Sequence, residues 1–204
     1  MPRKSSKSHI LETAESLFAA RGIENISLRH INEATGLSPA AVHYHFKNKE
    51  NLLTAILLRD GRAAAQRDSI AQDIERGQLA LNKRNFIIAM MQPLETRFLE
   101  DGISGQHFTK IIAQIYAHKH HEYKDLLPDE FQQISKRARS LLLKLKSGEE
   151  ITSALLSYSF LSIAWVEALA SFDAITPIAK TEAELLEQKT YYIKQLREFL
   201  TQAL

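Results

Sequence analysis

The sequence predicts an all-α protein, on the strength of three observations. The chain of 204 residues contains only seven glycines and five prolines, fewer than a turn-rich β fold of this length would need. Runs in which β-branched residues alternate with polar ones, the pattern of a half-buried strand, are absent. A hydrophobic fraction of 45% is enough for a sizeable core, in one large domain or two small ones.

The first expected helix spans residues 8–21, and Gly22 ends it. Its apolar residues recur at i, i+4, i+7 and i+8 and therefore form one stripe along the helix. The stripe consists of Ile10, Ala14, Leu17 and Phe18. We expect this face to cover the inner side of the two helices that follow.

Residues 27–49 are predicted to form two short helices joined by a tight turn, followed by the start of a third. Ser27 can cap the first helix, and Gly36 can adopt the left-handed conformation that ends it. Ser38 caps the second helix, and Asn48 caps the third. Helix, turn, helix is the motif that places its second helix in the DNA major groove, although a plain three-helix packing unit is the alternative.

The outer face of the second short helix suits contact with DNA. Val42 and Phe46 lie four residues apart and are expected to point inward. The alanines on the other face allow close approach and can contact a thymine methyl, while the tyrosine and histidines can reach phosphates or base edges. This outer face consists of Ala40, Ala41, His43, Tyr44 and His45.

A dense set of positions within residues 8–59 matches one known family. They are Ala14, Leu17, Phe18, Gly22, Ser27, Arg29, Ile31, Ala34, Gly36, Leu37, Ser38 and the run YHFKNKENL from Tyr44 to Leu52. In these positions the chain closely resembles the tetracycline-repressor (TetR/AcrR) family of bacterial transcriptional regulators. The resemblance implies a homodimer that binds a double-stranded DNA operator, most often as a repressor released by a small-molecule effector.

Carried over position by position, the resemblance also implies the DNA-contacting residues. They are Ser27, Arg29, Ser38, Ala40, Ala41, His43, Tyr44, His45, Lys47 and Lys49. Where the family has its more informative polar residues, this chain has Pro39, Ala40 and Ala41, which have no side-chain hydrogen-bond donor. Methyl contacts or DNA shape are therefore expected to replace base reading by the early part of this helix.

A long fourth helix over residues 48–75 is expected to link the DNA-reading end to the rest of the chain. Leu52, Leu53, Ile56 and Leu57 lie in its first half, which belongs to the N-terminal core. We therefore place the domain boundary near Leu58, within this helix. The domains are residues 1–58, for DNA binding, and residues 59–204, for ligand binding and dimerisation.

Five more helices bring the expected total to about nine. They cover residues 83–100, a segment that begins at Ser104, and residues 129–146, 149–172 and 181–204. Pro93 is expected to kink the first of the five. Thr181 and Glu184 have the spacing of a capping box.

The last two helices are long and amphipathic, so they can pair with the same two helices of a second copy. Closing the core of the monomer is the alternative, and the resemblance favours dimerisation. The expected interface residues are Leu155, Ser162, Leu169, Tyr192, Leu196 and Phe199.

Adaptable and aromatic side chains between residues 83 and 172 could enclose an apolar ligand pocket. Such residues at helical spacing more often only fill a core. By resemblance, this region binds the effector. The candidates are Phe86, Met90, Met91, Phe98, Phe108, Tyr116, Phe160 and Trp165.

Several classes of function are disfavoured. The chain has no cysteine, which excludes disulfides and thiolate chemistry. No glycine-rich phosphate loop, nucleophile elbow or supported carboxylate pair is found, so we expect neither an enzyme nor a cofactor. No apolar run follows the basic N-terminus, and no apolar segment of 18 residues is expected, so we predict a cytoplasmic protein without a membrane span.

Two smaller features leave alternatives open. His118, His121 and Glu122 share a helical face at a spacing that could hold a divalent metal, but a solvated helix end is the simpler interpretation, and we predict no metal site. The net charge of +2 is weak evidence for nucleic acid. A ligand-independent DNA-binding regulator and a helical interaction module without DNA binding are the rival functions.

Overall fold

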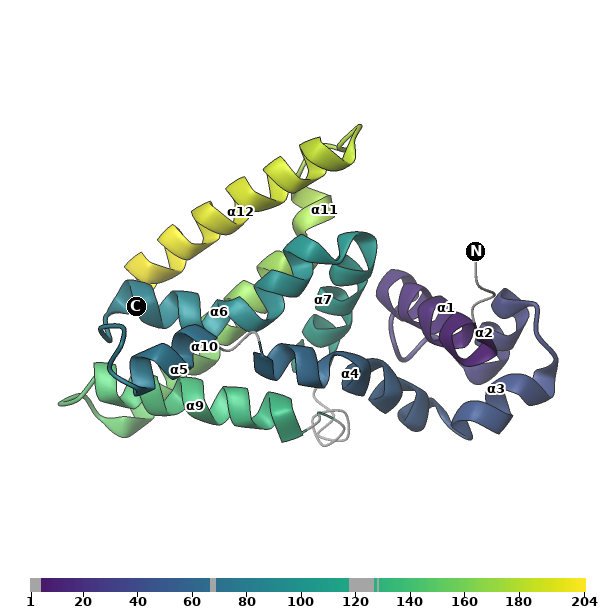
Figure 1. Ribbon diagram of the computed structural model, residues 1–204, viewed down its shortest axis with the longest axis horizontal. Helices are drawn as coiled ribbons and strands as arrows, with labels where there is room; N and C mark the ends of the chain where they lie inside the picture. The colour runs from purple at the N-terminus through teal and green to yellow at the C-terminus, as the bar shows by residue number, and fades with distance from the viewer. Residues whose placement is uncertain (1–4, 67–68, 118–126, 128) are drawn as a thin grey trace.

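The structure, a computed structural model, describes residues 5–66, 69–117, 127 and 129–204. Its helices separate into two groups, α1–α3 at one end and a larger bundle at the other, with α4 running between them (Figure 1). The helices are α1 (Ser6–Arg21), α2 (Leu28–Thr35), α3 (Pro39–Phe46), α4 (Lys49–Gln66), α5 (Ser69–Glu75), α6 (Lys83–Glu100), α7 (Gly102–Ala117), α9 (Asp129–Leu145), α10 (Ile151–Ala170), α11 (Phe172–Ile175) and α12 (Glu182–Ala203). The described residues form no strand, only an isolated bridge between Ser147 and Glu149.

The all-α prediction is confirmed, but two of the predicted helices are divided. Where one helix was expected over residues 48–75, the structure has α4 and α5. The helix expected over 149–172 ends at Ala170, and the Ser171 N–H bonds to the carbonyl of Glu167 before the short α11 begins. The described part of the chain therefore contains eleven helices where about nine were predicted.

The apolar stripes of the N-terminal helices meet at one end of the continuous hydrophobic core. The side chains of Phe18, Ile31 and Val42 from α1, α2 and α3 are fully buried, and Leu53 of α4 joins them. The first half of α4 thus belongs to this core, which agrees with the expected role of that segment. In α2 the buried partner of Ile31 is Thr35, four residues on.

Contacts between the two helical groups are made mainly by α1, which packs on α7. Gln114 of α7 holds the C-terminal end of α1 through both ends of its amide. Its Nε2 donates to the Phe18 carbonyl at 2.9 Å, and its Oε1 accepts from the Ile23 N–H at 2.7 Å. One side chain thereby satisfies two backbone groups that a helix end would otherwise leave free.

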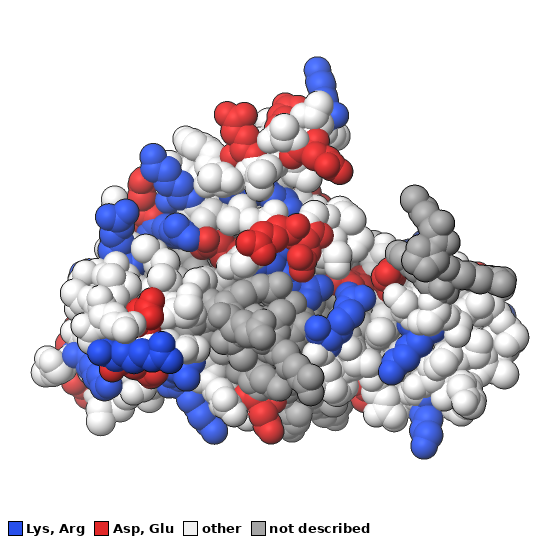
Figure 2. Space-filling model, in the orientation of Figure 1, with Lys and Arg blue, Asp and Glu red and all other residues white. Residues whose placement is uncertain are grey.

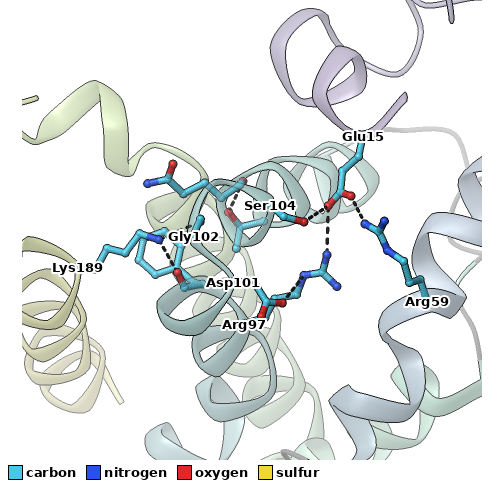
Figure 3. A network of polar contacts seen from close by, with 10 residues as sticks. Glu15, Arg59, Arg97, Asp101, Gly102, Ser104 and Lys189 are labelled. Carbon is cyan, nitrogen blue, oxygen red and sulfur yellow. Dashed lines mark hydrogen bonds and ion pairs between the residues drawn. The ribbon is translucent and has the colours of Figure 1, made fainter. Parts of the chain in front are cut away.

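Next to this contact lies a buried carboxylate, that of Glu15, whose side chain is only 2% exposed. Arg59 of α4, Arg97 of α6 and Ser104 of α7 all donate hydrogen bonds to it (Figure 3). The Arg97 and Ser104 bonds are both 3.1 Å long. Because these donors come from three helices, the buried carboxylate on α1 is stabilised only while α4, α6 and α7 keep their positions relative to α1. We call this set the Glu15 cluster.

The junction between α6 and α7 is held from its other side by α12. The Lys189 ammonium of α12 donates to the carbonyls of Phe98, at 2.7 Å, and Gly102, at 3.1 Å. Burial lowers the pKa of Lys189, and the charge of Asp101 opposes this effect. At Gly105, an added Cβ would lie 2.3 Å from the Arg97 carbonyl oxygen, so α7 can approach α6 this closely only with glycine here.

A second ion pair fastens α12 to α6. Arg197 binds the Glu95 carboxylate with two hydrogen bonds, of which the one from Nε is 3.0 Å long. Burial raises the pKa of Glu95, because it disfavours the charged carboxylate, and Arg197 acts in the opposite direction. Together with Lys189, this pair joins α12 to α6 at two levels.

We predict that Glu15→Gln destabilises the protein by about 3–5 kcal/mol, because the buried Arg97 would then keep only its longer ion pair with Asp101, at 3.7 Å. Urea unfolding followed by circular dichroism measures the change. The matched control is Glu33→Gln, which breaks the exposed Arg29–Glu33 pair of α2 and should leave the midpoint nearly unchanged. Equal midpoints for wild type and Glu15→Gln would contradict the role given to this cluster.

Candidate nucleic-acid interface and cavity

The turn between α2 and α3 is built by short-range hydrogen bonds. Ser27 caps α2 by accepting from the His30 N–H, and the His30 ring accepts from the Ser27 N–H in return, at 3.2 Å. Gly36 ends α2 with φ +64°, in the left-handed region that favours glycine. Ser38 stands at the start of α3 as expected, but its side chain makes no capping bond. The Asn48 side chain caps α4 at 2.8 Å.

One face of α3 is turned to solvent and holds the predicted groove residues. Tyr44 is 83% exposed, and Ala40 and His43 are also exposed. Val42 and Phe46 are buried beneath, as the spacing predicted. An aromatic side chain this exposed has no role in the core, so the face is free to meet a partner.

His45 differs from its neighbours because it is half-buried. Its Nε2 lies 3.1 Å from the Ser6 hydroxyl of α1, and its ring meets Tyr44 edge-on with centroids 5.2 Å apart. Its position is therefore fixed within the N-terminal group, where it supports the orientation of Tyr44.

The predicted cations lie in three different settings. Arg29 is 87% exposed and paired with Glu33. Lys47 is exposed in the turn after α3, where its φ of +47° is unusual for a residue with a side chain. The Lys49 ammonium donates to the Ile23 carbonyl at 3.1 Å, so in the free protein it holds the chain between α1 and α2.

The two ends of the molecule differ in the charged side chains that they carry on the face shown in Figure 2. Acidic side chains gather over the N-terminal end of α12, where Glu182 and Glu184 stand in the first turn (Figure 2). The end formed by α1–α4 carries separate Lys and Arg side chains on this face and no comparable acidic cluster. A polyanion would therefore meet less repulsion at the α3 end.

Sequence comparison identifies this helical arrangement. The profile of the bacterial regulatory proteins of the tetR family matches residues 10–56, which contain α1, α2, α3 and the buried start of α4. Residues 10–56 thus match the N-terminal segment of the TetR family. This is the part of the chain in which the resemblance to that family placed the DNA-contacting residues.

Relatives of known role match the same part of the chain. The HTH-type transcriptional repressor AcnR of Corynebacterium glutamicum is 41% identical over 61 residues, which is 30% of this chain and 32% of AcnR. The regulator UidR of Escherichia coli is 32% identical over 62 residues, again 30% of this chain and 32% of its own length. The matched segment thus spans about a third of these relatives.

Solved structures extend the likeness of fold beyond this segment to nearly the whole chain. The fatty acid degradation regulator FadR from Bacillus halodurans has a TM-score of 0.60 and covers 98% of this chain and 96% of its own, at 14% identity. SmeT, the repressor of a multidrug efflux pump of Stenotrophomonas maltophilia, has a TM-score of 0.53 and covers 94% and 90%, at 18% identity. These identities support the fold alone.

An apolar cavity of about 60 Å³ lies between α6, α7, α9 and α10. Of the predicted pocket residues, Met90, Tyr116 and Trp165 line it. Phe86, Met91, Phe98 and Phe108 are fully buried but belong to the packed core and do not line this cavity. Phe160 is 65% exposed and faces away from it, which corrects its assignment. Ser135, Tyr158 and Ser162 line the cavity without having been predicted to do so.

The predicted dimer residues are divided between two sides of their helices. Leu155 and Phe199 are exposed, whereas Ser162 and Leu169 are buried within the monomer and are not available to a second copy. Tyr192 and Leu196 are partly buried, and the Tyr192 hydroxyl donates to the Ala168 carbonyl of α10 at 2.8 Å. The exposed large apolar residues of α10 and α12 that were not among the predicted dimer residues are Ile151, Leu156, Phe160, Ile163, Leu186 and Tyr191.

α10 also corrects the expectation that no long apolar segment exists. An 18-residue window within it has a mean hydropathy of 1.4, so by length and composition the helix could cross a membrane. One such helix is weak evidence, because core helices of soluble proteins pass the same test. In this structure α10 packs on α7 and α9, and only 33% of that window is buried.

His118, His121 and Glu122, the considered metal face, lie outside the described residues. Within the described ranges, no group of three or more His, Asp or Glu side chains is placed to hold a metal ion. Arg3 and Lys4 of the basic N-terminus are also outside these ranges.

We predict that Tyr44→Ala weakens operator binding by about 10–100-fold, because an exposed aromatic side chain is lost from the groove face. Fluorescence anisotropy with labelled operator DNA measures the affinity, and Tyr44→Phe separates the hydroxyl from the ring. The unfolding midpoint should not fall. Unchanged operator affinity would count against the assignment of this face.

Lys49 should bind a phosphate when DNA is present, and Lys49→Ala should then reduce the slope of log K against log [salt] by about one unit. The matched control is Lys83→Ala, which removes an exposed lysine at the start of α6. A slope equal to that of wild type, combined with lower stability, would mean that Lys49 serves only the Ile23 carbonyl.

Proposed function

We propose that this protein is a homodimeric TetR-family repressor that leaves its operator when a small molecule binds to the helical bundle. The single observation that carries the proposal is the solvent-facing side of α3, where Tyr44 projects from a helix whose other side is locked into a core. In this reading residues 1–58 bind DNA, and residues 59–204 bind the ligand and the second copy. The protein would act in the cytoplasm.

The exposed apolar residues of α10 and α12 support dimerisation. These helices are in contact and are linked by the Tyr192–Ala168 hydrogen bond. Leu156, Phe160 and Ile163 form an exposed stripe along α10 at spacings of four and three residues. Apolar surface of this extent on one side of a helix pair is typical of an interface. A dimer would present two α3 helices to half-sites about 34–36 Å apart.

Repression and ligand release are supported by the relatives and by the cavity. AcnR and SmeT are described as repressors. A ligand in the bundle can weaken DNA binding only by its differential affinity for two arrangements of the α3 helices, typically about 1–3 kcal/mol. The contacts through which α1 is fixed on α7, made by Gln114 and the Glu15 cluster, give such a ligand a physical route to the DNA-binding end.

The proposal is tested by introducing a charge into the interface. Phe160→Asp should convert the dimer into a monomer in multi-angle light scattering, because a carboxylate would have to be desolvated between two copies. Binding to the protein's own upstream DNA should weaken at least tenfold in gel-shift titrations, since one recognition helix alone discriminates poorly.

The control is Leu58→Asp, which places the same charge at an exposed leucine of α4, away from α10. A Phe160→Asp protein that stays dimeric would overturn the proposed interface. A wild-type protein that gives no retarded band with its upstream DNA would favour an interaction module. DNA binding that no small molecule alters would favour a ligand-independent regulator.

A further inference from the structure

The small cavity opens into a larger groove between α9 and α10. The groove has a volume of about 580 Å³, within the range of sites for small ligands. The cavity of about 60 Å³ equals roughly two water volumes, so it could take only the end of a ligand's apolar part. Cavity and groove are continuous, because Tyr116, Phe131, Ser135, Tyr158 and Ser162 line both.

A buried hydroxyl stands where the two spaces meet. Ser162 is 5% exposed, and its Oγ has no hydrogen-bond partner among the described residues. Buried polar atoms are nearly always satisfied, because leaving one without a partner destabilises the folded state. An oxygen atom of a ligand at this point would accept the missing bond.

The groove wall formed by α9 is cationic. Lys136 and Arg139 stand three residues apart on one face of the helix, and both line the groove. The Arg139 guanidinium lies 5.9 Å from the centre of the Tyr158 ring, which holds it over the groove. The described lining residues include no Asp or Glu, and Arg137 of α9, which does not line the groove, pairs with Glu75.

The apolar and polar parts of this site are separated in space. Met90, Leu94, Ile112, Trp165 and Val166 line the cavity but not the groove, whereas Lys136 and Arg139 line the groove but not the cavity. A ligand matching both ends has an apolar body and a negatively charged head. A neutral hydrocarbon would leave the hydroxyl unsatisfied, and an inorganic anion would leave the cavity unfilled.

We propose that the groove between α9 and α10 binds an amphiphilic carboxylate, with its apolar end in the cavity and its carboxylate near Lys136, Arg139 and Ser162. This inference rests on the proposed function, in which the bundle binds the effector, and it names the chemical class of that effector.

Trp165 gives a direct measurement, because it is the one tryptophan of the chain and it lines the cavity. Its fluorescence is titrated with decanoate and decyltrimethylammonium below their micelle-forming concentrations, and with 1-decanol below its solubility limit. Decanoate should bind about tenfold more tightly than decanol, because a charge-assisted hydrogen bond is added, and the cation should bind least. Decanol binding as tightly as decanoate would overturn the proposal.

Arg139→Gln should weaken decanoate binding about tenfold and leave decanol binding unchanged. The matched control is Arg84→Gln, which removes an exposed arginine at the start of α6, outside the groove, and should alter neither. Ser162→Ala keeps the small volume but removes the hydroxyl, and should weaken decanoate binding several-fold. Equal decanoate affinity in wild type and Arg139→Gln would contradict the proposed position of the ligand carboxylate beside Arg139.

The fluorescence titration needs no DNA, so it fails or succeeds independently of the repressor proposal. Selective decanoate binding without any effect in the gel shift would support the ligand class and overturn ligand-controlled release. Absence of decanoate binding by a protein that still retards its operator would overturn the ligand class and leave DNA binding in place.

Discussion

The arrangement of the two helical groups depends on how the Glu15 carboxylate is satisfied. A charge buried to this degree carries a desolvation penalty of several kcal/mol unless donors surround it, and here they come from α4, α6 and α7. The Arg97 guanidinium also lies 3.9 Å above the Phe108 ring, so its own position is fixed by the bundle core. The N-terminal helices are thereby attached to the bundle by polar contacts that tolerate few geometries, in addition to the apolar core that both groups share.

α10 connects the other proposed activities because its sides have different environments. One side contributes Ser162 and Trp165 to the cavity. The opposite side leaves Leu156 and Phe160 in solvent, where we propose the second copy binds. A ligand that shifts α10 would therefore act on the dimer contact as well as on the bundle. The same helix packs on α7, and α7 packs on α1. The proposed sites for the ligand, the second copy and DNA are therefore connected through direct helix contacts.

Local patterns allowed the fold class and the exposed face of α3 to be predicted, since helical spacing alone separates Tyr44 from Val42. They did not separate the sides of α10, because that helix is apolar or small all round. Phe160 was therefore predicted in the pocket and Ser162 in the dimer interface, whereas Phe160 is exposed and Ser162 lines the cavity. The partners of Glu15 could not be predicted, since Arg97 and Ser104 follow it by 82 and 89 residues. The available signal was a carboxylate four residues after Leu11 and three before Phe18, on an otherwise apolar face.

The missing side chain at Gly105 determines how movement would spread through this molecule. Because α6 and α7 touch backbone to backbone there, neither can slide along the other without a collision, and the two helices behave as one stiff block. Lys189 fixes α12 to the same block, and Gln114 fixes α1 to it. Because α3 lies at the far end of the molecule, a tilt of the block would displace α3 more than it displaces the block itself. In the proposed dimer, a slight adjustment in the bundle could then change the spacing of the two α3 helices, so that it no longer matches one turn of DNA.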